Sequence, residues 1–224
     1  MKIKAILFDL DNTLLDFLKF KRGCCDAAID GMISAGLEMK KDDALKILFE
    51  LYDKYGIEYD KIFQKFLEKV KGKVDYRILG HGIMEYRKKR ESYIVPYEGA
   101  VSVLTNLKKN YKLAIISDAP RIKAWERLVA SGLDRFFDAV ITKGDVKVQK
   151  PSSRIFRKAL QILNAKPEEA IMVGDKVERD IKGAKRLGIT SVFARYGNPS
   201  VKKSGADFDI RNIKELVGII GKFE

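Results

Sequence analysis

The chain has 224 residues, of which 46% are hydrophobic and 33% charged, a composition typical of a globular protein rather than a disordered or collagen-like one. Its 44 lysines and arginines exceed its 31 aspartates and glutamates, giving a formal net charge of +13. Its only cysteines, Cys24 and Cys25, are adjacent, which excludes a disulfide framework, and the single histidine excludes a zinc-finger architecture. The amino-terminal apolar run is too short for a signal peptide, and no uncharged apolar stretch approaches the ~18 residues of a membrane span. We therefore expect a cytoplasmic protein.

The first part of the chain combines one strand with a long helical stretch. Residues 3–8 form a short apolar run that ends at an acidic residue, which predicts a buried strand. Residues 16–95 contain no clean strand, and aspartate before an apolar-periodic run with glycine after it marks two helices there. Four helices are expected in this stretch, over residues 22–35, 42–55, 60–71 and 76–92. The sequence therefore predicts an all-helical insertion.

From residue 96 onward, strands and helices alternate. Further strands are predicted over residues 113–116, 139–141, 171–173 and 191–194. Helices are predicted over residues 155–163, from Pro167, over 181–187 and over 210–220. This alternation predicts an α/β fold, in which a parallel sheet has helices on both faces. Residues 1–15 and 96–224 then form the core, and residues 16–95 form the inserted helical domain.

Two carboxylates, Asp9 and Asp11, come directly after the first predicted strand. Ligands of open parallel sheets bind at the carboxyl edge of the strands. One of the two carboxylates could act as a nucleophile and the other as a general acid and base. On this fragment alone, a solvated turn is an equal alternative.

Two further polar residues follow later strands. Ser117 ends the strand before Pro120, and its hydroxyl could donate to a phosphate oxygen, cap the next helix, or do both. Lys150 precedes Pro151 at the start of a helical run, where a compact cation sits beside backbone N–H groups. Taken alone, Lys150 is better explained as one more surface lysine among many.

The fourth polar feature is Gly174 followed by Asp175, with Asp180 five residues later. Glycine lets the backbone approach a ligand closely. Asp175 and Asp9 together could hold a hard cation through oxygen ligands, as Mg²⁺ prefers. The alternative is that Asp175 caps the next helix.

The order of these four features resembles the haloacid dehalogenase superfamily, specifically its phosphatases with a helical (C1-type) cap. The blocks that carry the resemblance are Phe8–Leu14 and Val173–Ile181, and residues 16–95 look like the cap. Within the family, the chain is most similar to small archaeal phosphatases, some of which act on glyceraldehyde 3-phosphate. The resemblance covers nearly the whole chain and implies a Rossmann-like core.

The resemblance also implies roles for three residues of the first block. Asp9 attacks phosphorus and forms an aspartyl-phosphate, and Asp11 protonates the leaving oxygen and then activates water. Thr13 supports the loop. The halide-releasing members of the family lack the second acid, so Asp11 favours phosphoryl transfer.

The resemblance implies binding roles for the remaining candidate residues. Ser117 and Lys150 bind the phosphoryl oxygens, and Asp175 holds Mg²⁺ with the Asp9 carboxylate and the backbone carbonyl of Asp11. Asp180 helps to arrange the metal's surroundings. Asp118 departs from the family, since many relatives carry asparagine there, which leaves its role open.

These implications lead to an expected function: a Mg²⁺-dependent phosphoric monoester hydrolase that acts on a small phosphorylated metabolite, such as a triose or sugar phosphate. A phosphotransferase or mutase with the same core is the nearest alternative. The positive charge also suggests a nucleic-acid-binding protein as an alternative. Against this, the basic residues are scattered and no nucleic-acid recognition motif stands out. A receiver-like phospho-switch is disfavoured by the motif order and the long insertion. We expect neither a nucleic-acid nor a membrane partner.

Three cations follow the first motif closely: Lys19, Lys21 and Arg22. They could contact the distal end of an anionic substrate or form a solvated helix face, and the second interpretation is favoured. The sequence does not indicate the physiological substrate or the oligomeric state.

Overall fold

The computed structural model describes residues 2–223, without the side chains of residues 91 and 93. The chain divides into two compact units. Met1–Phe17 and Val95–Glu224 form the first, here called the core unit, and Leu18–Ile94 form the second, the helical module. The sequence analysis expected the helical domain over residues 16–95.

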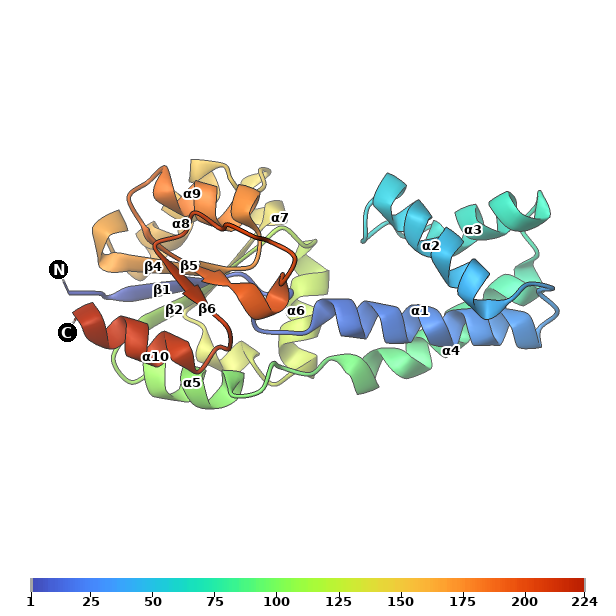
Figure 1. The fold of residues 1–224 in the computed structure, drawn as a ribbon, viewed down its shortest axis with the longest axis horizontal. Coiled ribbons are helices and arrows are strands. Elements are labelled where there is room, and N and C mark those ends of the chain that lie inside the picture. The colour runs from blue at the N-terminus through green and yellow to red at the C-terminus, as the bar shows by residue number, and fades with distance from the viewer. Residues whose placement is uncertain (1, 224) are drawn as a thin grey trace. The chain divides into compact units, whose positions relative to one another are not determined.

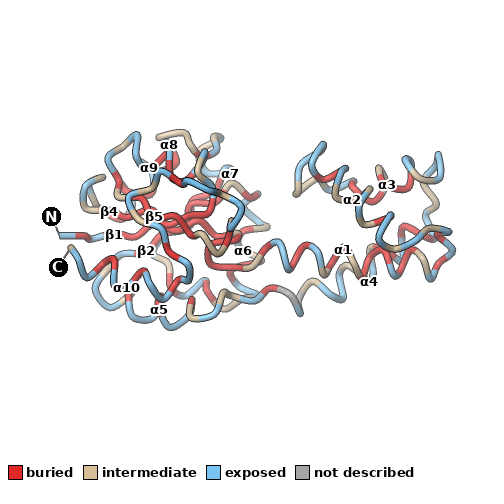
Figure 2. The backbone as a smooth tube through the Cα atoms, in the orientation of Figure 1, coloured by how far each residue is buried: buried red, intermediate tan, exposed pale blue. Residues whose placement is uncertain are grey.

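The core unit is built on one parallel sheet. Its strands are β1 (Ala5–Phe8), β2 (Lys112–Ser117), β3 (Ala139–Thr142), β4 (Ala170–Gly174), β5 (Thr190–Ala194) and β6 (Phe208–Ile210). The strand order is β3-β2-β1-β4-β5-β6, and every neighbouring pair is parallel. The central strands are continuously apolar because both of their faces are buried, as the red tube of Figure 2 shows. The predicted α/β fold is thereby confirmed.

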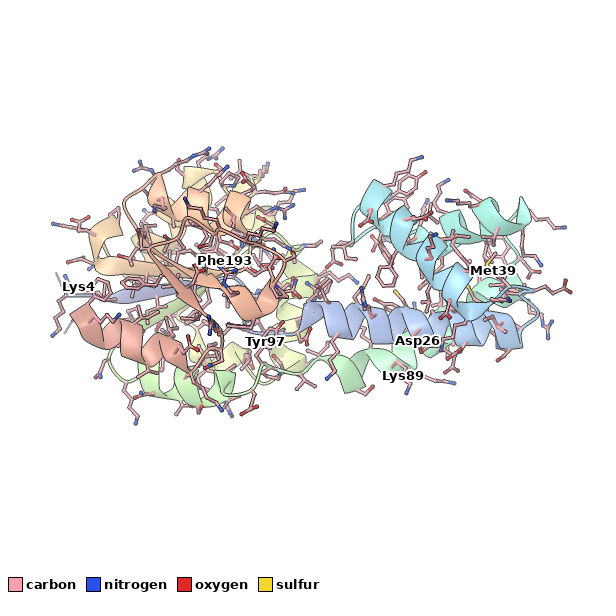
Figure 3. The ribbon with its side chains drawn as sticks, viewed as in Figure 1. Lys4, Asp26, Met39, Lys89, Tyr97 and Phe193 are labelled. Carbon is pink, nitrogen blue, oxygen red and sulfur yellow. The ribbon has the colours of Figure 1, made fainter. Side chains whose placement is uncertain are left out.

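Helices cover both faces of this sheet (Figure 1). The helices are α5 (Ala100–Leu107), α6 (Arg121–Ala130), α7 (Lys143–Val146), α8 (Ser153–Leu163), α9 (Lys182–Lys185) and α10 (Glu215–Ile220). Figure 1 shows α8 and α9 on one face and α5 and α10 on the other. On the first face, Ile155 and Phe156 of α8 pack against Leu7 and Ile116 of the strands. Phe193 of β5, labelled in Figure 3, is fully buried.

The helical module has a hydrophobic core of its own. It comprises α1 (Phe17–Ser34, whose first residue belongs to the core unit), α2 (Lys41–Tyr55), α3 (Ile62–Lys71) and α4 (Tyr76–Tyr93). Each helix contributes buried side chains to one cluster, among them Met32, Leu48, Phe66 and Ile78. Asp75 caps α4 by accepting from two backbone N–H groups, at 3.1 and 3.2 Å. No helix in the described part of the chain is both long and apolar enough to cross a membrane.

Two predicted helices differ most clearly in the structure, and the helix expected over residues 22–35 begins earlier, at Phe17. The helix expected over residues 210–220 begins only at Glu215, because Ile210 is the buried end of β6 and pairs with Ala194. A short apolar run does not by itself distinguish a strand from a buried helix. The helix expected from Pro167 is a single 3₁₀ turn over Pro167–Glu169, since β4 begins at the next residue.

Candidate active site

The candidate site lies at the carboxyl edge of the sheet, around the end of β1. This strand lies between β2 and β4, which the chain reaches by separate crossovers, and such a point opens a crevice for ligands. Phe8 pairs with Val173 of β4, and Asp9 extends this pairing by donating its backbone N–H to the Val173 carbonyl at 2.9 Å. Asp9 and Asp175 therefore leave the sheet from adjacent strand ends.

A tight turn follows Asp9. Asn12 has a φ of 60°, the left-handed region that asparagine tolerates better than most residues. Hydrogen bonds from the Asn12 N–H to the Leu15 carbonyl (2.7 Å) and from the Leu14 N–H to the Leu10 carbonyl (3.0 Å) close the turn. The turn keeps Asp11 close to the sheet edge instead of letting the chain run on.

Lys150 connects three strand ends. Its ammonium donates to Oδ1 of Asp9 and to the Ile116 carbonyl (2.9 Å), and it pairs with Oδ1 of Asp180 at 2.8 Å. Lys150 is only 5% exposed, so the surface-lysine interpretation is wrong. Burial alone lowers the pKa of this amine, but the nearby carboxylates, chiefly those of Asp180 and Asp9, outweigh burial and raise it. Lys150 therefore stays protonated at any physiological pH.

Three carboxylates converge beside this lysine. One oxygen each from Asp9, Asp175 and Asp180 lies within 4.8 Å of the others, and all three residues are buried. Neither side-chain oxygen of Asp175 accepts a hydrogen bond from the described residues, although Nζ of Lys176 lies 3.3 Å from Oδ2. Buried carboxylate oxygens without donors are costly, and a cluster of them suits a hard divalent cation such as Mg²⁺. The donor set present fits that ion.

Two of the clustered acids, Asp9 and Asp175, have raised pKa values. Burial raises the pKa of Asp9 well above its usual value, Lys150 opposes the shift, and the neighbouring carboxylates, first that of Asp180, add to it. Burial and Asp180 likewise raise the pKa of Asp175 to about 6, against the opposing effect of Lys176. A bound cation favours the ionised form of each of these acids.

The raised pKa of Asp175 predicts that Mg²⁺ affinity depends on pH. Protons compete with the metal for the carboxylates, so affinity is full well above pH 6 and falls as the pH drops through that value. We expect the affinity measured by titration calorimetry to weaken roughly tenfold or more between about pH 7 and about pH 5. An affinity that stays constant over this range would contradict the expectation that Asp175 is a metal ligand.

Asp118 and Gly174 have structural roles in this arrangement. Asp118 accepts the backbone N–H of Lys150 (2.9 Å) through Oδ1 and pairs with Arg179 (3.2 Å) through Oδ2. It thus links the loop of Lys150 to the loop after β4. A Cβ atom at Gly174 would collide with the carboxylate of Asp180, so this glycine makes room for a neighbouring side chain rather than for a ligand.

Ser117 and Thr13 are both buried at the same edge. The Ser117 hydroxyl accepts the backbone N–H of Ala119 at 3.2 Å, within the turn between β2 and α6, and a hydroxyl that accepts can also donate its proton. It does not cap α6, whose N-terminal cap residue is Pro120. The Thr13 hydroxyl makes no hydrogen bond with the described residues, whereas its carbonyl accepts the Tyr196 hydroxyl at 2.7 Å. Thr13 is thus held to the neighbouring loop through its backbone.

The loop after β5, residues 195–198, supports the site although the sequence analysis did not single it out. Besides the contact from Tyr196, Asn198 donates its amide to the Asp175 carbonyl at 3.2 Å. Tyr196 also packs edge-on against Tyr97, which is labelled in Figure 3, with ring centroids 4.8 Å apart. A Cβ atom at Gly197 would overlap the Asn12 carbonyl. Glycine and asparagine just past a strand were a signal that could have indicated this loop.

Replacing Gly197 by alanine is expected to displace the Asn12 turn, because the new methyl group meets backbone rather than a flexible side chain. We expect kcat to fall about 100-fold, since small displacements of catalytic groups are costly, and unfolding free energy to fall by roughly 1–3 kcal/mol. Steady-state kinetics and urea unfolding measure both effects. Gly205→Ala is a suitable control, because nothing lies within 4 Å of its Cβ position, although its positive φ still strains alanine. Equal kinetics for the two variants would contradict the role given to this loop.

Arg127 is a further residue that the sequence analysis missed. It lies on α6 and pairs through Nη1 with Oδ2 of Asp11 at 2.6 Å. Nothing in the local sequence distinguishes it from the other surplus cations, because its partner lies 116 positions earlier in the chain.

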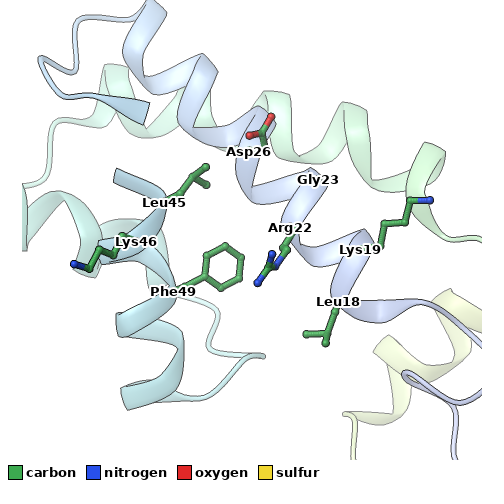
Figure 4. Close-up of a pocket in the computed structure, with 8 residues that line it drawn as sticks. All are labelled: Leu18, Lys19, Arg22, Gly23, Asp26, Leu45, Lys46 and Phe49. Atoms are coloured by element: carbon green, nitrogen blue, oxygen red, sulfur yellow. The ribbon is translucent and has the colours of Figure 1, made fainter. Parts of the chain in front are cut away.

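The three cations after the first motif differ from one another. Lys21 is buried within the helical module, donates to the Tyr86 hydroxyl at 3.3 Å and lies 4.4 Å from the ring centre of Tyr52, so it is not part of a solvated face. Lys19 and Arg22 line a pocket of about 880 Å³ within the module (Figure 4). Its lining residues are Leu18, Lys19, Arg22, Gly23, Asp26, Leu45, Lys46 and Phe49. Cations beside apolar walls suit an organic anion.

Comparisons with known proteins show which family the chain is similar to. The family model described as haloacid dehalogenase-like hydrolase matches residues 6–194. The chain is 34% identical to the glyceraldehyde 3-phosphate phosphatase of Methanothermobacter thermautotrophicus, over 96% of this chain and 100% of that protein. It is 36% identical to the protein of the same name from Methanocaldococcus jannaschii, over 97% of each.

The fold of this chain is also similar to that of solved structures. A HAD phosphatase from Thermococcus onnurineus superimposes with a TM-score of 0.68 at 30% identity, over 98% of both chains. A HAD hydrolase from Bacillus subtilis, YfnB, superimposes with a TM-score of 0.76 at 23% identity, over 99% of this chain and 100% of that one, which supports the fold. The chain belongs to the haloacid dehalogenase-like hydrolase family.

Proposed function

We propose that this protein is a Mg²⁺-dependent phosphatase that hydrolyses a small phosphorylated metabolite through an aspartyl-phosphate on Asp9. The observation that carries the proposal is the convergence of a buried, protonated lysine with three buried carboxylates at the carboxyl edge of the sheet. A cationic group between acids suits a phosphate dianion better than it suits a neutral substrate.

The chain's own residues supply the groups for two successive displacements. A carboxylate oxygen of Asp9 attacks phosphorus, the bond to the leaving oxygen breaks, and Asp11 gives that oxygen a proton. Asp11 then takes a proton from a water molecule that attacks the phosphorus, and the phosphate leaves with Asp9 restored. Lys150 and the hydroxyl of Ser117 donate to the phosphoryl oxygens in both steps.

The metal would be held by Asp9 and Asp175, with the backbone carbonyl of Asp11, and Asp180 would help to arrange them. When bound, Mg²⁺ reduces the repulsion between carboxylate and phosphate and stabilises charge on the equatorial oxygens. Lys150 shares this task and also keeps Oδ1 of Asp9 in place, which leaves the other oxygen for the attack.

For the substrate we propose a triose or sugar phosphate, on the strength of the relatives named glyceraldehyde 3-phosphate phosphatase. A phosphotransferase or mutase with the same core differs only in the acceptor, a sugar hydroxyl in place of water. Product analysis with an added acceptor sugar separates the two, because a hydrolase releases inorganic phosphate regardless of the acceptor.

The experiment that tests the proposal is a phosphate-release screen over a panel of phosphorylated metabolites, with Mg²⁺ and with excess chelator. We expect release from small sugar or triose phosphates that the chelator abolishes. Release that is unaffected by the chelator would contradict the metal requirement, and no release from any ester would contradict the proposal itself.

A further inference from the structure

The ion pair between Arg127 and Asp11 is partly buried, and the buried arginine is held on two sides. The Arg127 side chain is 7% exposed, and its Nη1 lies 2.6 Å from Oδ2 of Asp11. The guanidinium carbon lies 4.2 Å from the ring centre of Phe17, within the range of a cation–π contact. Ala124 and Leu128, which flank Arg127 on α6, are fully buried and fix the helix in the core unit.

This burial separates Arg127 from the other cations of the same helix. Arg121 begins α6, is 58% exposed and pairs with Asp145, away from the acids of the site. Removing charges from water is costly, so a buried pair is stable only when its geometry is well defined. The rigid, planar guanidinium supplies such geometry, and it stays charged at every pH of interest.

A proton-transfer group in the position of Asp11 needs a fixed orientation. Its carboxylate sits on a turn, and rotation about its side-chain bonds would move the acidic oxygen away from the leaving group. Arg127 engages Oδ2, and a carboxylate can carry the transferred proton on its other oxygen, Oδ1. Arg127 thus holds the Asp11 carboxylate through Oδ2, while the proton is transferred through Oδ1.

We infer that Arg127 is a positioning residue for Asp11 and that it orients this carboxylate for proton transfer to the leaving oxygen. The inference rests on the proposed phosphatase activity. It does not follow from the motifs, since Arg127 lies on α6 and belongs to none of them.

The leaving group provides the test, because esters differ in how much they need the proton. An alkyl phosphate releases a strongly basic alkoxide and depends on the acid, whereas 4-nitrophenyl phosphate releases a stable anion and does not. The ratio kcat/KM reports steps only up to the departure of the leaving group, which excludes the later attack by water. For Arg127→Met we expect kcat/KM to fall roughly 30- to 100-fold with a triose phosphate and less than about threefold with 4-nitrophenyl phosphate.

Matched variants separate positioning from a structural defect. Arg127→Lys keeps the charge and is expected to recover part of the lost kcat/KM for the alkyl ester. Arg121→Met removes an arginine from the same helix. It should leave kcat/KM for both esters near the values of the unchanged protein. In an Asp11→Asn background, Arg127→Met should cost less than about twofold, because the group it orients is gone.

Each outcome decides one question. If Arg127→Met or Arg127→Lys lowers kcat/KM equally for both esters, or if the loss persists in the Asp11→Asn background, the inference is wrong. Should Arg127→Met prove too unstable in thermal unfolding, the comparison of the two esters is made with Arg127→Lys, which must then show the same selective loss. If the unchanged protein hydrolyses neither ester, the proposed function fails instead.

Discussion

Replacing Asp9 by asparagine is expected to abolish phosphate release, with a loss of roughly 10⁴-fold or more. The amide is close in shape to the carboxylate but is not a nucleophile, so no aspartyl-phosphate forms. The fold should survive, because the substitution removes one of three clustered buried acids and its oxygen can still accept from Lys150. Phosphate release and thermal unfolding measure the two effects.

Asp118→Asn is the matched control for this substitution. It makes the same chemical change at another strand end, where the carboxylate accepts the Lys150 backbone N–H and pairs with Arg179. We expect it to reduce activity less than about tenfold, since an amide oxygen also accepts the backbone N–H. Retained hydrolysis in Asp9→Asn, or equal losses in both variants, would count against covalent catalysis by Asp9.

The second large effect is expected for Lys150→Met. Methionine fills a similar volume but removes a buried cation that contacts both Asp9 and Asp180. Breaking a buried ion pair from one side costs about 3–5 kcal/mol, because a charge is left buried without compensation. We expect a loss of unfolding free energy of this size near neutral pH, together with loss of activity.

The dependence of this loss on pH and metal identifies its cause. The pKa of Asp9 is already raised by burial, and without Lys150 it rises further. At low pH the acids are protonated and neutral in the folded variant, so its deficit relative to the unchanged protein should shrink as the pH falls. Added Mg²⁺ should also restore part of the stability by binding the folded state.

Lys176→Met provides the comparison for Lys150→Met. Lys176 also lies near an acid of the site, but its side chain is 48% exposed and its ammonium is 3.3 Å from Asp175. Because Lys176 is half exposed, water screens its charge and the pair contributes less than that of Lys150, so we expect a loss of about 1 kcal/mol in urea unfolding. A deficit for Lys150→Met that is equally small, or that grows at low pH, would contradict the account of the buried cluster.

The sheet and its polar edge could be predicted because their signals are local. Strands buried on both faces appear as short apolar runs, and Asp9, Ser117 and Asp175 each follow such a run directly. Parallel strands bring these ends to one edge whatever the rest of the chain does. The sequence therefore allowed the acids to be grouped without coordinates.

Residues whose role depends on distant contacts could not be predicted in this way. Arg127 and Lys21 resemble the other surplus cations in sequence, yet one is buried against Asp11 and the other between two tyrosines. Gly197 matters because the Asn12 carbonyl lies against it, and this contact joins positions far apart in the chain. The last helix was predicted to begin at Ile210 but begins at Glu215, because an apolar residue such as Ile210 fits the end of a buried strand as well as the start of a buried helix.

The most direct test of the central claim is a rapid acid quench of the protein during turnover of its substrate, followed by peptide mass analysis. We predict one phosphoryl group on the peptide that contains Asp9, present with Mg²⁺ and absent in Asp9→Asn. Continued turnover with no covalent phosphate on that peptide, or with phosphate on a different residue, would contradict the mechanism.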